Sequence, residues 1–181
     1  GAPVIGSIKA GVAVIAFSDF ECPFCGVFAR DTYPRLHREL IETGRIAFAF
    51  RHFPLTTIHP LARRAAASSV CAAKQGRFAP MHDSLFTSPI KLDEPSLFAR
   101  ATALGLNEEQ FAKCMQDPDS EVQADIDAAR SLGIKSTPTF LIGSIVGEDK
   151  VRVSRVLVGA RPAEDFHRAV EEAEKRPGGG G

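Results

Sequence analysis

The sequence predicts a single α/β domain made of a strand–helix–strand unit, a long helical region, two further strands and a last helix. Its 181 residues, 44% of them hydrophobic, are enough to bury one sizeable core but too few for two independent ones. Apolar residues follow strand and helix periodicities in turn along the chain. Lys plus Arg equals Asp plus Glu at 22 each, and this zero net charge argues against non-specific binding to nucleic acid or anionic membranes.

The N-terminal third has the pattern of a parallel strand–helix–strand unit. Residues Val12–Phe17 form an apolar, β-branched run that predicts a central strand buried on both faces. Apolar residues then recur at helical spacing, with Pro23 suited to the first turn of the helix and Gly44 to its end. Residues 45–53 alternate between apolar and other side chains, which predicts a second strand parallel to the first.

Residues 60–133 have helical composition and predict four or five helices. The breaks between them are expected at Gly76, Ser88–Pro89, Gly105 and Asp117–Pro118. Short polar residues followed by acidic residues indicate helix starts at Asp93, Asn107 and Asp119.

Two strands and a helix are expected near the C-terminus. Residues Thr139–Ile142 and Val151–Val158 predict paired strands joined by a turn around 147–149, and Pro162 opens a last amphipathic helix. Residues 177–181, a proline and four glycines, predict a flexible tail. The longest apolar run is far shorter than the roughly 20 residues that span a bilayer.

Cys22 and Cys25 form a C-x-x-C pair at the predicted start of the first helix. This spacing puts the two cysteines on one turn, close enough for their sulfurs to bond. Cys22 faces unpaired backbone N–H groups and the positive end of the helix dipole, which predicts a low thiol pKa and a nucleophile. Cys25 lies one turn further in, so a higher pKa and the resolution of a mixed disulfide are expected of it.

Two structural readings of the C-x-x-C pair stay open beside the redox one. Half of a zinc site would need two more Cys or His ligands, but no second pair exists and the five histidines show no ligand spacing. A purely structural disulfide would close so small a loop that it removes little entropy from the unfolded chain.

Several motifs occur together in a recognisable order. They are Phe17–Cys25 (FSDFECPFC), Phe50–Leu55 (FRHFPL), Gln75–Phe78 with Met81–Asp83, and Ser136–Phe140 (STPTF). In these motifs the chain resembles the DsbA-type thiol:disulfide interchange family over about Gly11 to Glu174. The resemblance implies a thioredoxin fold with an inserted helical subdomain at about 56–133, all within one domain of residues 1–176.

The resemblance also implies roles for particular residues. Cys22 and Cys25 would be the redox pair, and a cis bond between Thr137 and Pro138 would face them and receive a substrate chain as an added strand. From spacing alone, a trans Pro138 that starts an edge strand is the simpler reading. Phe24, between the cysteines, is expected to be exposed and to contact apolar segments of unfolded substrates, and Pro23 beside it is expected to belong to the same substrate-binding site.

The sequence departs from the best-known oxidant of that family at two positions. Phe24 stands where that oxidant has histidine, so the pKa of Cys22 is expected to be lowered less. Ala16 stands where it has a buried glutamate, so Cys25 lacks that proton acceptor. Asp19 or Glu21 could replace it through water, although a turn residue and an exposed charge are the simpler readings.

Cys71 and Cys114 both fall in the predicted helical region. A disulfide between them would be structural, with a sequence separation of 114 − 71 = 43 residues, and would stabilise the fold by about 4 kcal/mol. Two separate buried thiols are the alternative, because free cysteine packs well as a small hydrophobic residue.

The function expected from the resemblance is that of a dithiol oxidase acting on reduced exported proteins in the periplasm or elsewhere outside the cytoplasm, as a monomer. Its reoxidation is expected from a quinone-linked membrane partner of the DsbB or vitamin-K-epoxide-reductase type, with no metal or organic cofactor. An isomerase of this family would carry a dimerisation domain, which the chain lacks. The alternatives are an isomerase or reductase of the same fold, a glutathione-dependent transferase or isomerase, and a non-enzymatic peptide-binding chaperone.

Overall fold

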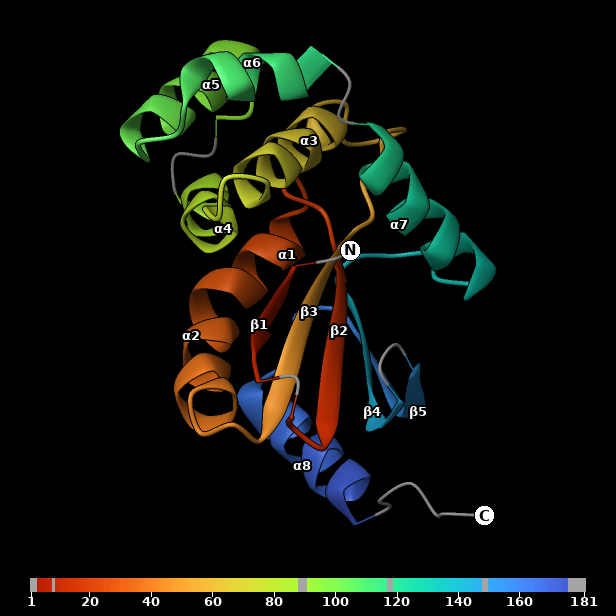
Figure 1. The fold of residues 1–181 in the computed structure, drawn as a ribbon. Helices are drawn as coiled ribbons and strands as arrows, with labels where there is room; N and C mark the ends of the chain where they lie inside the picture. Colours follow the sequence, from red (N-terminus) through yellow and green to blue (C-terminus); the bar gives the residue numbers. More distant parts are fainter. Residues whose placement is uncertain (1–2, 8, 88–90, 117–118, 148–149, 176–181) are drawn as a thin grey trace.

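The computed structural model describes residues 3–7, 9–87, 91–116, 119–147 and 150–175, in which five strands form one sheet (Figure 1). The strand order is β1-β3-β2-β4-β5. The strands are β1 (Val4–Gly6), β2 (Val12–Ser18), β3 (Ile46–His52), β4 (Thr139–Gly147) and β5 (Lys150–Val158). The expected α/β architecture, with helices inserted between β3 and β4, is confirmed.

β2 lies at the centre of the sheet, as its apolar run predicts. Every β2 residue except Ile15 is buried, β3 pairs with it in parallel, and β4 pairs with it in the antiparallel direction. The short edge strand β1 was not predicted, because three residues ending in a glycine carry no visible alternation. Gly6 has a φ of +93°, and a side chain there would meet the carbonyl oxygen of Ile46 at 2.9 Å.

The first helix is less regular than its pattern predicts. It runs as α1 (Pro23–Val27), the π-helical turn η1 (Phe28–Thr32), α2 (Tyr33–Leu36) and the π-helical turn η2 (His37–Ile41). The N–H of Tyr33 bonds to the carbonyl of Phe28, five residues back, next to Pro34, which has no N–H to donate. The helical residues end at Ile41, three before the predicted Gly44, which adopts a left-handed φ of +73°.

Among the described residues, five helices lie between β3 and β4, within the predicted four or five. They are α3 (Ala62–Ala73), α4 (Phe78–Phe86), α5 (Glu94–Ala103), α6 (Glu108–Gln116) and α7 (Asp119–Ser131). The side chains of Asp93 and Asn107 accept hydrogen bonds from the first turns of α5 and α6, as their sequence predicts. The predicted breaks at 88–89 and 117–118, the turn residues 148–149 and the tail 177–181 lie outside the described residues.

Helices cover both faces of the sheet. The alternation along β2 sends Val14 and Ala16 toward the first helix and α8 (Ala163–Glu174), where aromatic side chains fill the core. Phe17 points to the other face, under α7. In Figure 1, α3 to α6 gather at the end of the sheet at which α1 begins. Among the described helices none is both long and apolar enough to cross a membrane.

The hairpin of β4 and β5 is antiparallel, as predicted, but β4 continues to Gly147, five residues beyond the predicted Ile142. Gly143 explains why the sequence pattern stops early. The pairing register shifts at this residue, and a side chain there would lie 2.0 Å from the carbonyl oxygen of Arg152. A glycine is therefore required in the middle of this strand.

Buried His52 should make the fold sensitive to acid. The ring is 1% exposed, its Nδ1 has no hydrogen-bond partner, and burial, with a smaller effect of His82, lowers its pKa to about 3. Below pH about 6.5, the ordinary pKa of histidine, the unfolded chain binds a proton at this residue and the folded chain does not. The free energy of unfolding should therefore fall by ~1.4 kcal/mol for each pH unit by which the pH is lowered, until the folded pKa is reached. Urea unfolding of the wild type and of His52→Leu at several pH values measures this slope. Equal slopes in the two proteins would show that His52 does not cause it.

Candidate active site

Cys22 and Cys25 lie three residues apart at the start of α1, Cys22 just before the helix and Cys25 inside its first turn. Cys22 has an extended backbone (φ −72°, ψ 121°) and directly precedes the helix, whose first residue is Pro23. The N–H of Gly26 bonds to the carbonyl of Cys22 at 3.1 Å and closes the first turn. Cys22 is 6% exposed, Cys25 is fully buried, and both are free thiols.

The pKa of Cys22 is lowered from 9.0 to about 5. The largest cause is the hydrogen bond from the Cys25 thiol, and burial acts against it. The Thr137 side chain and the backbone groups of Cys25 and Phe24 lower the pKa further. At neutral pH Cys22 is therefore a thiolate, which is the nucleophilic form of the sulfur.

Cys25 has the opposite behaviour. Burial raises its pKa well above 9.0, and the neighbouring Cys22 sulfur raises it again. The Ser18 side chain and the backbone N–H of Asp19 act against this increase, and the N–H lies 3.4 Å from the Cys25 sulfur. The reduced site thus pairs one thiolate with one protonated thiol, as the order of the two cysteines predicts.

Thr137 meets Cys22 although more than a hundred residues separate them. β4 pairs with β2 so that Phe17 faces Thr139, which brings the residues before β4 to the residues after β2. The sulfur of Cys22 lies 3.4 Å from the carbonyl oxygen of Thr137. The bond between Thr137 and Pro138 is cis, as the resemblance implies. The hydroxyl of Thr137 is buried without a nitrogen or oxygen partner.

Exposed apolar side chains flank the cysteines. Phe24 is 63% exposed, and Pro23 beside it is exposed as well. Ile58 and Leu61, which are 67% and 40% exposed, lie in the loop after β3. The N–H of Leu61 bonds to the Glu21 carboxylate at 2.8 Å, which ties this loop to the residue before Cys22. Sequence patterns give no sign that Leu61 lies near the cysteines, because its place depends on this bond.

Asp19 and Glu21 are more buried than expected of a turn residue and an exposed charge. The Asp19 side chain has no exposed surface and bonds to the ring of His59, whereas Glu21 is half-buried. Ala16 is buried, and its methyl group offers no proton acceptor to Cys25. Asp19 follows β2 and His59 follows β3, so the meeting of the carboxyl ends of two parallel strands is the signal that could have paired them.

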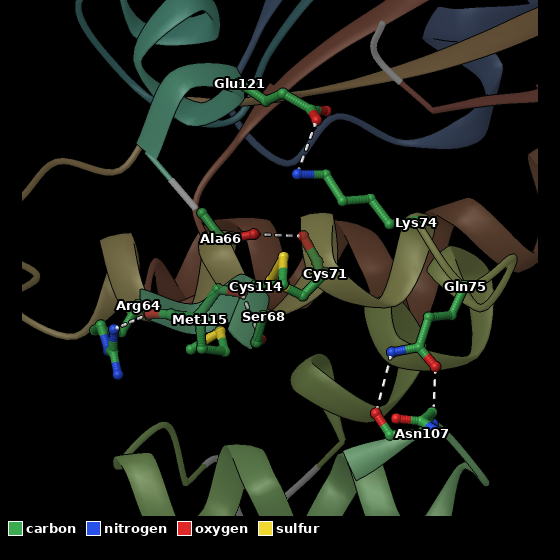
Figure 2. Close-up of a disulfide and its surroundings, with 12 residues drawn as sticks. Arg64, Ala66, Ser68, Cys71, Lys74, Gln75, Asn107, Cys114, Met115 and Glu121 are labelled. Atoms are coloured by element: carbon green, nitrogen blue, oxygen red, sulfur yellow. Dashed lines mark hydrogen bonds and ion pairs between the residues drawn. A yellow bond between two sulfur atoms is a disulfide. The ribbon is translucent and has the colours of Figure 1, made fainter. Parts of the chain in front are cut away.

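Cys71 and Cys114 form a disulfide between α3 and α6, with an S–S distance of 2.04 Å (Figure 2). The alternative of two separate thiols is therefore wrong. Gln75 and Asn107 exchange two hydrogen bonds at one end of the same helix contact. This cysteine pair thus joins two helices of the inserted region. Within the described ranges no group of three or more His, Cys, Asp or Glu residues is placed to hold a metal ion.

Known proteins resemble the chain in both sequence and fold. Residues 1–157 match the family described as Thioredoxin. The Na(+)/H(+) antiporter NhaA 3 of Salinispora tropica is 34% identical over 141 residues, which are 77% of this chain and 21% of the antiporter. Disulfide bond formation protein D of Bacillus subtilis is 28% identical over 164 residues, 81% of this chain and 69% of that protein.

The structural comparison agrees with the sequence comparison. The crystal structure of Wolbachia pipientis alpha-DsbA1 superposes with a TM-score of 0.79 and 26% identity, covering 98% of this chain and 92% of that one. The predicted thioredoxin fold with inserted helices is thereby confirmed. The chain spans only about a fifth of the length of the antiporter that it matches.

Proposed function

Because the chain belongs to the thioredoxin family, we propose that it is a thiol:disulfide oxidoreductase that introduces disulfides into other proteins through Cys22 and Cys25. One observation carries the proposal, namely the lowered pKa of Cys22 beside the raised pKa of Cys25. A stabilised thiolate favours the reduced form of the pair, so the disulfide form is a good oxidant. The similarity to Disulfide bond formation protein D supports the same activity.

The proposed reaction consists of two thiol–disulfide exchanges. A substrate thiolate attacks the Cys22 sulfur of the Cys22–Cys25 disulfide, and Cys25 leaves and takes up a proton. A second substrate thiolate then attacks the substrate sulfur of the mixed disulfide, and Cys22 leaves as a stable thiolate. The substrate loses two electrons to form one disulfide, and the protein gains them as a dithiol. In the reverse direction Cys25 resolves the mixed disulfide.

The proposed substrates are reduced, unfolded proteins exported from the cytoplasm. The exposed side chains of Phe24, Ile58 and Leu61 offer apolar contacts to such chains on the rim of the site. An extended substrate segment would run along Thr137 and Pro138, because the Thr137 carbonyl lies beside the Cys22 sulfur. Unfolded chains expose both apolar side chains and free backbone groups, so they fit this surface better than folded ones.

The proposed reaction takes place outside the cytoplasm, where protein disulfides persist. Reoxidation of the dithiol is assigned to a quinone-linked membrane partner of the DsbB or vitamin-K-epoxide-reductase type. The protein is proposed to act as a monomer and without a cofactor, as one domain of residues 1–176 that includes the inserted helices. The buried second thiol, Cys25, favours a dithiol oxidase over a glutathione-dependent transferase, which needs only one catalytic residue.

Oxidative refolding of a reduced, denatured test protein measures the proposed activity. With glutathione disulfide as the terminal oxidant, catalytic amounts of the protein should speed the loss of substrate thiols and the recovery of native substrate. The reduction potential should lie closer to that of DsbA, about −120 mV, than to that of thioredoxin, about −270 mV. No acceleration over glutathione alone would refute the oxidase, and a potential near −270 mV would make the protein a reductant.

A further inference from the structure

A buried carboxylate and an imidazole meet directly beside the redox pair. Asp19 is the first residue after β2, and its side chain has no exposed surface. His59 comes from the loop after β3, and its side chain is 15% exposed. The Nδ1 atom of the His59 ring lies 2.8 Å from Oδ2 of Asp19. None of the reaction steps proposed above uses these two side chains.

The hydrogen bonds to Asp19 show which atom of the His59 ring carries a hydrogen. Besides the ring of His59, the backbone N–H groups of Glu21 and Leu55 donate to the Asp19 carboxylate, each at 2.8 Å. The two backbone N–H groups are fixed donors, and the carboxylate oxygens of Asp19 offer the His59 ring only acceptors. The Nδ1 atom of His59 therefore carries a hydrogen. Without His59 the buried charge would keep only two backbone partners.

The backbone of Asp19 touches both cysteines. Its N–H lies 3.4 Å from the Cys25 sulfur, and its carbonyl accepts a hydrogen bond from the N–H of Cys22 at 3.2 Å. The pairing of β2 with β3 ends one residue earlier, at Ser18 and His52. No strand pairing fixes the orientation of Asp19, so the contacts of its side chain help these two backbone contacts to hold it.

We propose that His59 is a positioning residue for disulfide exchange, which holds Asp19 so that the backbone N–H of Asp19 stays directed at the Cys25 sulfur. The inference rests on the proposed function, in which Cys25 is the group that leaves when a substrate attacks Cys22. An N–H aimed at a sulfur that gains negative charge stabilises it as it leaves. The same contact fixes Cys25, whose thiol donates to the Cys22 thiolate.

The test compares reduced variants by the ultraviolet absorbance of the Cys22 thiolate across pH, and by their redox equilibrium with glutathione. His59→Leu cannot donate to Asp19 and should raise the titration midpoint of Cys22 by about one pH unit, or about tenfold in its ionisation constant. His59→Asn places an amide N–H at the same branch of the side chain and should restore the wild-type midpoint. His167→Leu is the matched control, because His167 is 22% exposed and pairs with Glu39 at 2.7 Å.

The outcomes separate a positioning role from mere loop anchoring. A raised midpoint in His59→Leu, with wild-type midpoints in His59→Asn and His167→Leu, supports the inference. A wild-type midpoint in His59→Leu overturns it, whatever happens to the thermal stability. If His59→Leu does not fold, His59→Gln decides in the same way, because its amide nitrogen lies where histidine has Nε2 and cannot replace the Nδ1 donor to Asp19. Failure of the wild type to form the Cys22–Cys25 disulfide with glutathione disulfide would instead refute the proposed function.

Discussion

Cys22→Ser is expected to abolish disulfide transfer, whereas Cys25→Ser is expected to accumulate a mixed disulfide with its substrate. The difference follows from the two sulfurs, because only Cys22 combines some exposure with a lowered pKa. Without Cys25 no second thiol of the protein can attack the bond between Cys22 and a substrate. Refolding rates together with non-reducing gels and mass spectrometry of the trapped complex measure both effects.

The control for this prediction removes the other two cysteines. A protein with Cys71→Ala and Cys114→Ala keeps the C-x-x-C pair and should still transfer disulfides at a temperature where it is folded. Undiminished turnover by Cys25→Ser would contradict the dithiol mechanism. It would favour instead a glutathione-dependent enzyme with a single catalytic residue.

Removal of the Cys71–Cys114 disulfide is expected to lower the free energy of unfolding by about 4 kcal/mol. The bond joins residues 43 positions apart, so without it the unfolded chain gains the conformational freedom of a long loop. The hydrogen bond from Arg64 to the carbonyl of Met115 remains in the variant, as do the two between Gln75 and Asn107 just outside the two helices (Figure 2). The native contact between α3 and α6 should therefore persist, and the loss should come mostly from the unfolded state.

Denaturant unfolding of the double alanine variant, with the wild type in the same buffer, measures this loss. The variant Cys22→Ala with Cys25→Ala is the matched control, since it removes two cysteines but no disulfide between helices. A loss below about 1 kcal/mol in the Cys71 and Cys114 variant would show that the bridge contributes little to stability.

Local patterns in the sequence predict most of the fold. The apolar run of β2 and the helical spacing after Cys22 each depend on residues close to one another, so they can be read without the tertiary structure. Pro34 is also visible in the sequence, but a proline alone does not predict a π-helical turn, because that turn depends on how the whole helix packs. The disulfide partners of Cys71 and Cys114 cannot be fixed by spacing, because pairing depends on which helices meet.

The chemistry of the candidate site was only partly predictable for the same reason. The order of Cys22 and Cys25 at a helix start is enough to predict which sulfur becomes the thiolate. The contact between Asp19 and His59 forms only because two parallel strands end at the same edge of the sheet. Leu61 is held near the residue before Cys22 by its bond to the Glu21 carboxylate, which no single stretch of sequence reveals.

The titration of the Cys22 thiol tests the central claim most directly. Reduced protein is followed by its thiolate absorbance from acid to alkaline pH, with Cys22→Ser as the blank. The structure predicts a transition with a pKa of about 5 that disappears in the blank, while Cys25 stays protonated well beyond neutrality. A midpoint near 9.0, the ordinary value of a cysteine thiol, would leave Cys22 uncharged at neutral pH and contradict the account.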